Sequence, residues 1–313
     1  MKIQKTKTVI PPRLRQGDTV GIVAPAGPFD MEKFERGIAV IESMGFHTVV
    51  PDNIYMKKGY LAGPDLHRAD LINIFFADRK IKAVFCARGG FGSIRILSLL
   101  DFQLIKKNPK IFVGFSDISA ILSILYSKCG LVVFHGPLVT GLGDASIKTR
   151  EALLAAVSSD LKLAIRPERG VTIRHGLAAG PVAGGNLTTL CHLVGTPFEP
   201  ELKGHILFLE DKGEAVYRID RMLSHMKLAG CFEGLSGLIL GSFKDCGSFS
   251  EIVGIVDNIF NKRDLPILAG FEVGHEKNNI TIPIGLNATL DTKRQVLSFH
   301  EPATAKKLRG END

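Results

Sequence analysis

The chain has 313 residues, of which 45% are hydrophobic and 23% are charged; this favours two globular domains with ample core and excludes wholesale disorder, collagen and coiled coil. The net charge of +7 at neutral pH is not gathered into an arginine-rich helix or a basic and aromatic pattern, so we expect no nucleic-acid partner. No apolar run reaches the roughly 18 residues of a membrane span, so we expect no membrane partner.

The first half of the chain alternates short β-branched apolar runs with stretches of helical spacing. The expected strands are 19–24, 46–50, 83–87, 111–115 and 132–134. The expected helices are 31–41, one that ends with residues 71–76, 92–100 and 118–129. This alternation predicts an α/β domain whose parallel sheet has helices on both faces and functional loops at the carboxyl ends of its strands. We assign residues 1–157 to this Rossmann-like domain.

The second half of the chain is a smaller unit. Residues 158–180 are charged and contain glycine, as in Arg166-Pro167-Glu168-Arg169-Gly170, and we interpret them as a linker. Residues 181–313 then form a C-terminal mixed α/β domain. Its expected strands are 205–209, 238–240, 280–284 and 296–299, and its expected helices are 216–228 and 252–260.

The cysteines and the N-terminal residues indicate the cellular compartment in which we expect the protein. The five cysteines are widely spaced and form no Cys-x-x-Cys pair, which favours buried thiols in a reducing compartment and no metal site. The basic start runs into Pro11, Pro12 and Arg13, where a secretory signal would be apolar. We therefore expect a cytoplasmic protein that needs no metal or other cofactor.

The segment Gly114-Phe115-Ser116-Asp117 joins an apolar strand to a helix through one tight turn. A serine in this position is lifted clear of the sheet, as in a nucleophile elbow, and the amide after it can meet an oxyanion. Ile118 replaces the second glycine of the Gly-x-Ser-x-Gly pattern. The alternative is that Ser116 and Asp117 only cap the helix.

A serine nucleophile needs a histidine base, and the base needs a carboxylate. Of the nine histidines, His135 and His275 follow strands in loops, where catalytic groups are commonly held. Glu210 directly follows four apolar strand residues, where an acid requires a partner, and Glu214 is the fallback. The order serine, acid, histidine also occurs in α/β-hydrolases.

A glycine-rich loop, Arg88-Gly89-Gly90-Phe91-Gly92, also follows a strand and opens a helix, so its amides could hold an anion. It is not a P-loop, and the first strand-to-helix turn lacks the dinucleotide-binding fingerprint. One amide of this loop and the amide of Asp117 could instead form an oxyanion hole.

Six motifs carry a family resemblance from about residue 10 to residue 300. They are Val23-Ala24-Pro25-Ala26-Gly27, Arg88-Gly89-Gly90-Phe91-Gly92, Gly114-Phe115-Ser116-Asp117, Gly184-Gly185-Asn186-Leu187, Leu209-Glu210-Asp211 with Tyr217-Arg218-Ile219-Asp220-Arg221-Met222-Leu223, and Gly274-His275 with Ile282-Pro283-Ile284-Gly285. In this order they resemble the serine LD-carboxypeptidase family, which comprises muramoyl-tetrapeptide carboxypeptidases and microcin C self-immunity hydrolases.

The resemblance implies a triad of Ser116, Glu210 and His275 whose members come from both domains and meet in one cleft. It places the oxyanion hole at the amides of Gly90 and Asp117, and it makes His135 structural. It also implies a homodimer that releases the terminal D-alanine from a murein tetrapeptide, a small peptide, through an acyl-enzyme in cell-wall recycling.

A carboxypeptidase must also bind the free carboxylate of its substrate, and a nearby cation can do so. Arg88 is our candidate, and the alternative is that it pairs with a structural acid.

Two other functions stay open. The microcin branch keeps the triad but cleaves aminoacyl nucleotides, and it stacks an aromatic side chain, typically Trp, on the base; this chain contains no Trp, which favours the murein peptide. A non-catalytic protein that binds a small ligand would use Ser116 only as a helix cap. The missing dinucleotide fingerprint argues against a dehydrogenase.

Overall fold

A computed structural model describes residues 7–306. The chain divides into two units, one of Met1–Asp160, Thr281–Gly285 and Ala303–Asp313 and the other of Leu161–Ile280 and Leu286–Pro302, and each is described in turn. All five cysteines are free thiols. Between residues 7 and 306, no helix is both long and apolar enough to cross a membrane.

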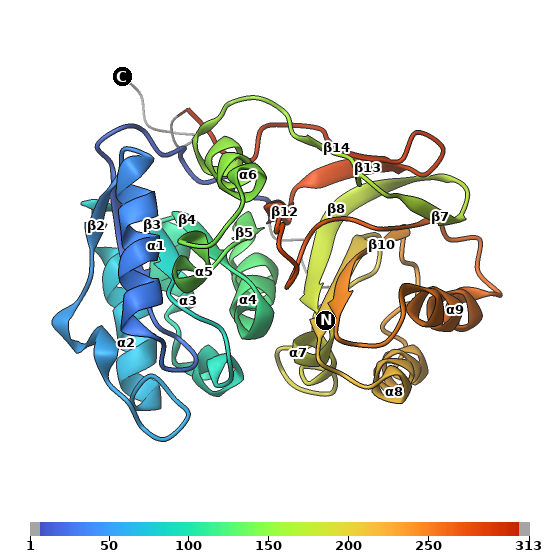
Figure 1. The fold of residues 1–313 in the computed structure, drawn as a ribbon, viewed down its shortest axis with the longest axis horizontal. Coiled ribbons are helices and arrows are strands. Elements are labelled where there is room, and N and C mark those ends of the chain that lie inside the picture. Colours follow the sequence, from blue (N-terminus) through green and yellow to red (C-terminus); the bar gives the residue numbers. More distant parts are fainter. Residues whose placement is uncertain (1–6, 307–313) are drawn as a thin grey trace. The chain divides into compact units, whose positions relative to one another are not determined.

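The first unit is built on a six-stranded sheet with the strand order β12-β5-β4-β3-β1-β2 (Figure 1). Its strands are β1 (Thr19–Val23), β2 (His47–Val49), β3 (Ile81–Cys86), β4 (Ile111–Gly114), β5 (Val133–His135) and β12 (Ile282–Ile284). All neighbouring pairs are parallel except β12 and β5. Strands β1, β3 and β4 are buried along most of their length, which explains why their sequences are continuous apolar runs.

Helices cover both faces of this sheet. They are α1 (Met31–Ser43), α2 (Asp65–Ala77), α3 (Phe102–Lys107), α4 (Ser119–Cys129), α5 (Val139–Leu142) and α6 (Ile147–Ser158), with 3-10 segments at Asp52–Tyr55, Ser93–Leu99 and Ser116–Ile118. Right-handed crossovers place α1 on one face and α2, α3 and α4 on the other. Accordingly α1 packs against α5, whereas α3 packs against both α2 and α4. The helix expected at 92–100 is a 3-10 segment.

The turn after β1 and the loop after β3 lie side by side where the strand order reverses. The amide of Ala87 donates to the carbonyl of Val23 at 2.8 Å, and the amide of Gly27 donates to the carbonyl of Gly89 at 3.0 Å. Open α/β sheets bind their ligands at such a switch point. Strand β4 is the next neighbour of β3, so Ser116 also reaches this edge of the sheet.

The second unit has an eight-stranded sheet in the order β6-β14-β13-β8-β9-β10-β11-β7. Its strands are β6 (Ala164–Ile165), β7 (Val171–Arg174), β8 (Leu177–Asn186), β9 (Ile206–Lys212), β10 (Gly237–Lys244), β11 (Ile267–Ala269), β13 (Asn287–Asp291) and β14 (Val296–Phe299). Strands β8 to β11 pair in parallel, and the outer strands pair antiparallel.

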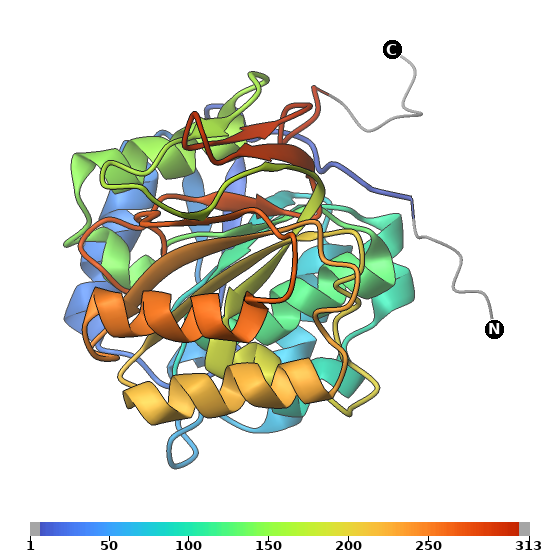
Figure 2. The same ribbon diagram turned by 90° about the vertical axis from the view of Figure 1, so that its right-hand side faces the viewer.

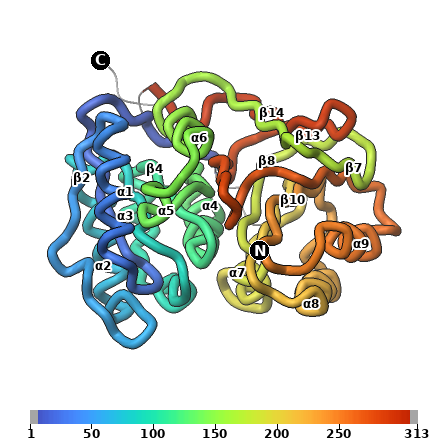
Figure 3. The backbone as a smooth tube through the Cα atoms, in the orientation of Figure 1, coloured from blue at the N-terminus to red at the C-terminus, as the bar shows by residue number. Residues whose placement is uncertain are grey.

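The helices of the second unit are α7 (Leu187–Cys191), α8 (Val216–Leu228) and α9 (Phe249–Phe260). Helix α8 follows β9 and α9 follows β10, a path that can be traced along the backbone in Figure 3. Figure 2 shows these two helices side by side, and they pack against each other. The expected α/β class is therefore confirmed, with a largely parallel sheet in one unit and a mixed sheet in the other.

Two boundaries differ from the sequence interpretation. Residues 158–180 contain β6, β7 and the start of β8, so part of the expected linker belongs to the second sheet. Strands β6 and β7 are short and lie at the two edges of that sheet, where charged residues are favourable and hide the strand pattern. Strand β12 falls within the expected C-terminal domain, yet it pairs with β5 of the first unit, because an apolar run does not reveal its partner strand.

Candidate active site

Ser116 stands at the turn between β4 and α4. Its φ of 63° lies in the left-handed region, which is costly for a residue with a side chain and is commonly retained at functional sites. The cap positions of the two helical segments here are Phe115 and Ile118, and neither makes a side-chain cap bond. A left-handed residue at a tight turn between a strand and a helix is the backbone geometry expected of a nucleophile elbow. Ile118 is fully buried, and a Cβ on Gly114 would lie 2.6 Å from its Cγ2 atom.

The double-glycine loop approaches Ser116 closely. A Cβ on Gly89 would lie 3.2 Å from Ser116 Oγ and 3.6 Å from the amide nitrogen of Asp117. Because glycine has no side chain, a space remains between this loop, the hydroxyl and that amide. The next residue, Gly90, is exposed and has a φ of 107°. The loop and the turn thus offer the surroundings that an oxyanion hole requires.

Arg88, at the start of the same loop, is exposed. Its Nη1 atom donates to the carbonyl of Pro28 in the turn after β1, so it does not pair with an acid through that atom. This contact holds the guanidinium at the edge of the sheet that also carries Ser116.

Glu210 and His275 form the central contact of the second unit. Glu210 lies near the carboxyl end of β9 and is fully buried, and its Oε2 atom is 2.7 Å from Nδ1 of His275. The backbone amide of His275 donates to Ser242 Oγ at 3.1 Å, which fixes the loop that carries the imidazole. Burial raises the pKa of Glu210, and the bond to His275 opposes this rise.

Gly274 allows this contact to form. Its φ is 118°, and a Cβ there would lie 2.5 Å from Glu210 Oε2 and 2.6 Å from Ser242 Oγ. No side chain fits at this position unless the carboxylate moves.

The other acids near Glu210 have different partners. Asp211 accepts hydrogen bonds from Asn186 Nδ2 at 3.0 Å and from the Thr188 amide at 2.9 Å, which ties β9 to the end of β8. Burial also raises the pKa of Asp211. Glu214 lies 3.4 Å from Arg218. Among these acids it is Glu210 that contacts His275.

The second candidate histidine, His135, lies in the first unit on β5 and is fully buried. Its ring packs edge-on against Phe115, with 5.6 Å between ring centroids. This position beneath the serine turn fits a structural role.

The structure thus brings Glu210 and His275 together in the second unit and holds Ser116, Gly89 and Gly90 in the first. The sequence interpretation did not single out Ser242 or Ser93, and it considered the side chain of Asp117 only as a helix cap. Ser242 had no local signal, because its role depends on a loop that is 33 residues away.

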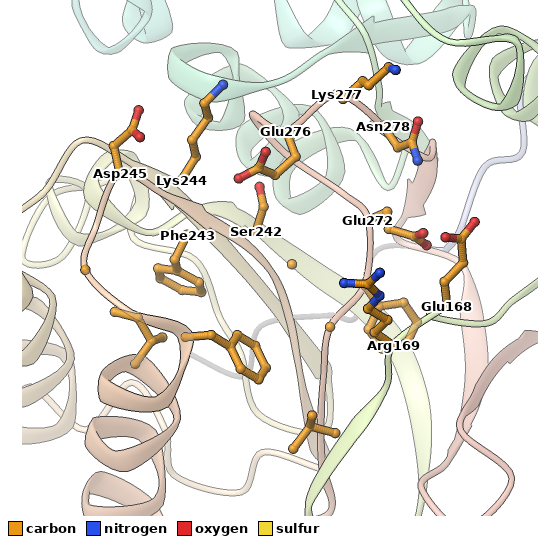
Figure 4. Close-up of a pocket in the computed structure, with 17 residues that line it drawn as sticks. Glu168, Arg169, Ser242, Phe243, Lys244, Asp245, Glu272, Glu276, Lys277 and Asn278 are labelled. Carbon is orange, nitrogen blue, oxygen red and sulfur yellow. The ribbon is translucent and has the colours of Figure 1, made fainter.

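A pocket of about 730 Å³ opens in the second unit at the carboxyl ends of β10 and β11 (Figure 4). Ser242 lines it, as do Glu272 and Glu276 on the loop that carries His275. In Figure 4 the labelled side chain of Phe243 lies on one side and Glu272, Glu168 and Arg169 lie on the other. The remaining charged side chains of its wall are Lys244, Asp245 and Lys277.

Among residues 7–306, no group of three or more His, Cys, Asp or Glu side chains could hold a metal ion.

The chain is similar to several known proteins. The chain is 35% identical to the probable murein peptide carboxypeptidase of Bacillus subtilis over 90% of its own length and 91% of that protein. The muramoyltetrapeptide carboxypeptidase from Oxalobacter formigenes has a crystal structure that matches with a TM-score of 0.79 at 28% identity, over 90% of this chain and 97% of that one. A microcin C7 self-immunity protein in complex with glutamyl sulfamoyl guanosine matches with a TM-score of 0.88 at 26% identity, over 95% of this chain and 100% of the other.

Two family profiles cover most of the chain. The LD-carboxypeptidase N-terminal domain matches residues 20–136, and the LD-carboxypeptidase C-terminal domain matches residues 179–290. Together with the relatives at 30% identity or more, these matches show that the chain belongs to the LD-carboxypeptidase family of peptidases.

Proposed function

We propose that this protein is a serine LD-carboxypeptidase that releases the terminal D-alanine from a murein tetrapeptide. The observation that carries the proposal is the buried hydrogen bond between Glu210 and His275, because folding alone gives little reason to bury a carboxylate. The left-handed backbone of Ser116 beside the double-glycine loop supplies the matching nucleophile.

In the proposed reaction, Nε2 of His275 accepts the proton of Ser116 as Oγ attacks the carbonyl carbon that precedes D-alanine. The carbon–nitrogen bond then breaks, and the imidazolium returns the proton to the leaving amine. The resulting ester is hydrolysed by water, with His275 again accepting and then returning a proton. Glu210 holds the proton on Nδ1, so that Nε2 is the basic nitrogen, and it stabilises the transient imidazolium.

The negative oxygen of each tetrahedral intermediate would be held by the amides of Gly90 and Asp117. The space beside Gly89 supports this role, since the Asp117 amide borders it. Arg88 is the proposed partner for the free carboxylate of D-alanine, because its exposed guanidinium is held at the same edge of the sheet.

The pocket of the second unit favours a peptide with an amine-bearing side chain. Four carboxylates and three cationic groups line it, together with Phe243, Phe249 and Phe271. Because the four carboxylates outnumber the three cationic groups by one, the wall has a small negative excess that favours an ammonium group over a phosphate or sulfamate, and aromatic rings can cover an alkyl stem. The side chain of the diamino acid before the scissile bond has this chemistry.

A second function is hydrolysis of aminoacyl nucleotides. The structural match to the microcin C7 self-immunity protein bound to glutamyl sulfamoyl guanosine favours this candidate. The absence of Trp weakens it, since that branch stacks an aromatic side chain on the base.

The two candidates differ in the substrate that is turned over. We expect release of D-alanine from the murein tetrapeptide at a kcat/KM at least about 100-fold above that for hydrolysis of an aminoacyl-sulfamoyl adenosine. Both rates can be measured with the same preparation, by an amino-acid oxidase assay and by chromatography. Preference for the adenosine conjugate would reverse the assignment of substrate.

Ser116 should be the residue that reacts with a fluorophosphonate. We expect labelling of the wild-type chain, none in Ser116→Ala, and labelling slowed by at least about 100-fold in His275→Ala, because the alcohol then has no base. Ser127→Ala on helix α4 is the matched control and should label as the wild type does. Intact-mass spectrometry measures each adduct. Equal labelling of the wild type and Ser116→Ala would exclude Ser116 as the nucleophile.

Glu210→Gln should keep the fold and lose the activity. Glutamine leaves His275 without the negative partner that sets its tautomer, so kcat should fall by about 10³- to 10⁴-fold. Measurement of kcat and of circular dichroism on the same sample separates the two effects. A variant that keeps kcat within about tenfold would remove Glu210 from the mechanism.

The same substitution has a pH signature. Because burial raises the pKa of Glu210 in the folded state, the native protein holds that proton more tightly than the unfolded chain does. Stability is therefore lost as pH rises from the unfolded value, near 4.5, through the raised pKa, whereas Glu210→Gln escapes this loss. Urea denaturation should show the variant gaining stability relative to the wild type over that interval. A difference that stays constant or shrinks would contradict the burial cost.

Gly274→Ala should disturb the same pair from the backbone side. The added methyl group would collide with the Glu210 carboxylate and strain a left-handed φ, so we expect kcat to fall by about 100-fold or more. Gly254→Ala is the matched control, since a Cβ there meets nothing within 4 Å. Steady-state kinetics of both variants tests this, and equal activity would show that the pair tolerates displacement.

A further inference from the structure

A buried carboxylate lies next to the proposed nucleophile and is not used in the mechanism above. Asp117 follows Ser116, and only 9% of its surface is exposed. Its Oδ2 atom accepts a hydrogen bond from the amide of Ser93 at 2.8 Å and also contacts the Ser93 hydroxyl. That hydroxyl lies 2.6 Å from the main-chain carbonyl oxygen of Asp117 as well, and Ser93 is fully buried.

These contacts join two segments that carry the proposed oxyanion hole. Ser93 directly follows the double-glycine loop that comes after β3, and Asp117 belongs to the serine turn that comes after β4. The register between β3 and β4 ends at Phe85 and Val113, so both segments continue beyond the last paired residues of the two strands. Asp117 and Ser93 link them there through main-chain and side-chain atoms.

A second buried side chain, that of Arg68, also binds the loop. Arg68 has 1% of its surface exposed, and its Nη1 atom donates to the carbonyl of Gly92 at 3.0 Å and to that of Pro25. Asp65 accepts from Arg68 and from Arg95. Arg68 therefore ties the end of the loop to the turn after β1, whereas Asp117 ties it to the serine turn.

We propose that the Asp117 carboxylate, together with Ser93, is a positioning device that sets the spacing of the two oxyanion-hole amides. The inference rests on the proposed function, since those amides matter only if Ser116 forms a tetrahedral intermediate. Oxyanion stabilisation depends on donors fixed a hydrogen bond's length from the developing charge, so a shift of the loop costs rate more than substrate binding. Asp117 touches no reacting atom through its side chain.

The chemistry of the contact predicts a graded response. Asparagine can place its single side-chain oxygen where Oδ2 lies and accept there from both the amide and the hydroxyl of Ser93, so Asp117→Asn should keep kcat within about tenfold. Asp117→Ala loses both bonds and should lower kcat by about 100-fold, with KM changed less than about threefold. Ser93→Ala keeps its amide bond and should lie between these two.

The experiment measures kcat and KM for D-alanine release, and the rate of fluorophosphonate labelling, in these variants and in the double variant Ser93→Ala/Asp117→Ala. The losses should not add, because Asp117→Ala already removes the contact between the carboxylate and the Ser93 hydroxyl that Ser93→Ala removes. Asp101→Ala is the matched control: this carboxylate caps α3 by accepting from Gln103 and Leu104, and its loss should leave kcat unchanged. If Asp117→Ala does not fold, Ser93→Ala and Asp117→Asn carry the test.

Each outcome decides the proposal. A KM effect without a kcat effect, additive losses, or wild-type kcat in Asp117→Ala would overturn the positioning role while Ser116-dependent turnover still upheld the proposed function. Absence of Ser116-dependent turnover and labelling in the wild-type chain would overturn both.

Discussion

The structure of the second unit depends most on one contact, the hydrogen bond between Glu210 and His275. A carboxylate without exposed surface must be compensated, and here the imidazole opposes the desolvation. The contact restricts three segments at once. Strand β9 must deliver an acid at its carboxyl end, the loop after β11 must pass without a side chain at Gly274, and β10 must supply Ser242 to hold the main chain of His275.

The two units share one structural feature. In each, the residue that follows the proposed catalytic group is a buried aspartate that ties its strand to a neighbouring segment. Asp117 links the turn after β4 to the loop after β3, and Asp211 links β9 to Asn186 at the end of β8 and to Thr188 in α7. The carboxyl ends of parallel strands bring such loops together but do not pair them, because the sheet ladder has ended. The aspartates continue the link by side-chain hydrogen bonds.

Local patterns in the sequence predict much of this arrangement. The apolar run before Gly114 and the helix after Ile118 identify the serine turn, and the acid after four apolar residues identifies Glu210. What the sequence does not reveal is pairing across long separations, as in β12 beside β5, or Ser242 beside His275. Asp117 was expected to offer only its amide, or to act as a helix cap. Its side-chain partner is 24 residues earlier, and no periodic signal connects the two positions.

The cost in stability of two site residues supports the proposed function. Ser116 holds a left-handed backbone, which costs on the order of 1–3 kcal/mol for a residue with a side chain, although glycine would adopt it freely. Glu210 buries a charge where glutamine would fill the same volume without one. Neither residue helps the chain to fold. Ser116 lies at the carboxyl end of a strand of the first sheet, and Glu210 lies near the carboxyl end of a strand of the second. Residues that cost stability at such positions support the proposed catalytic role, because a serine and a histidine paired with an acid are the groups that acyl transfer requires.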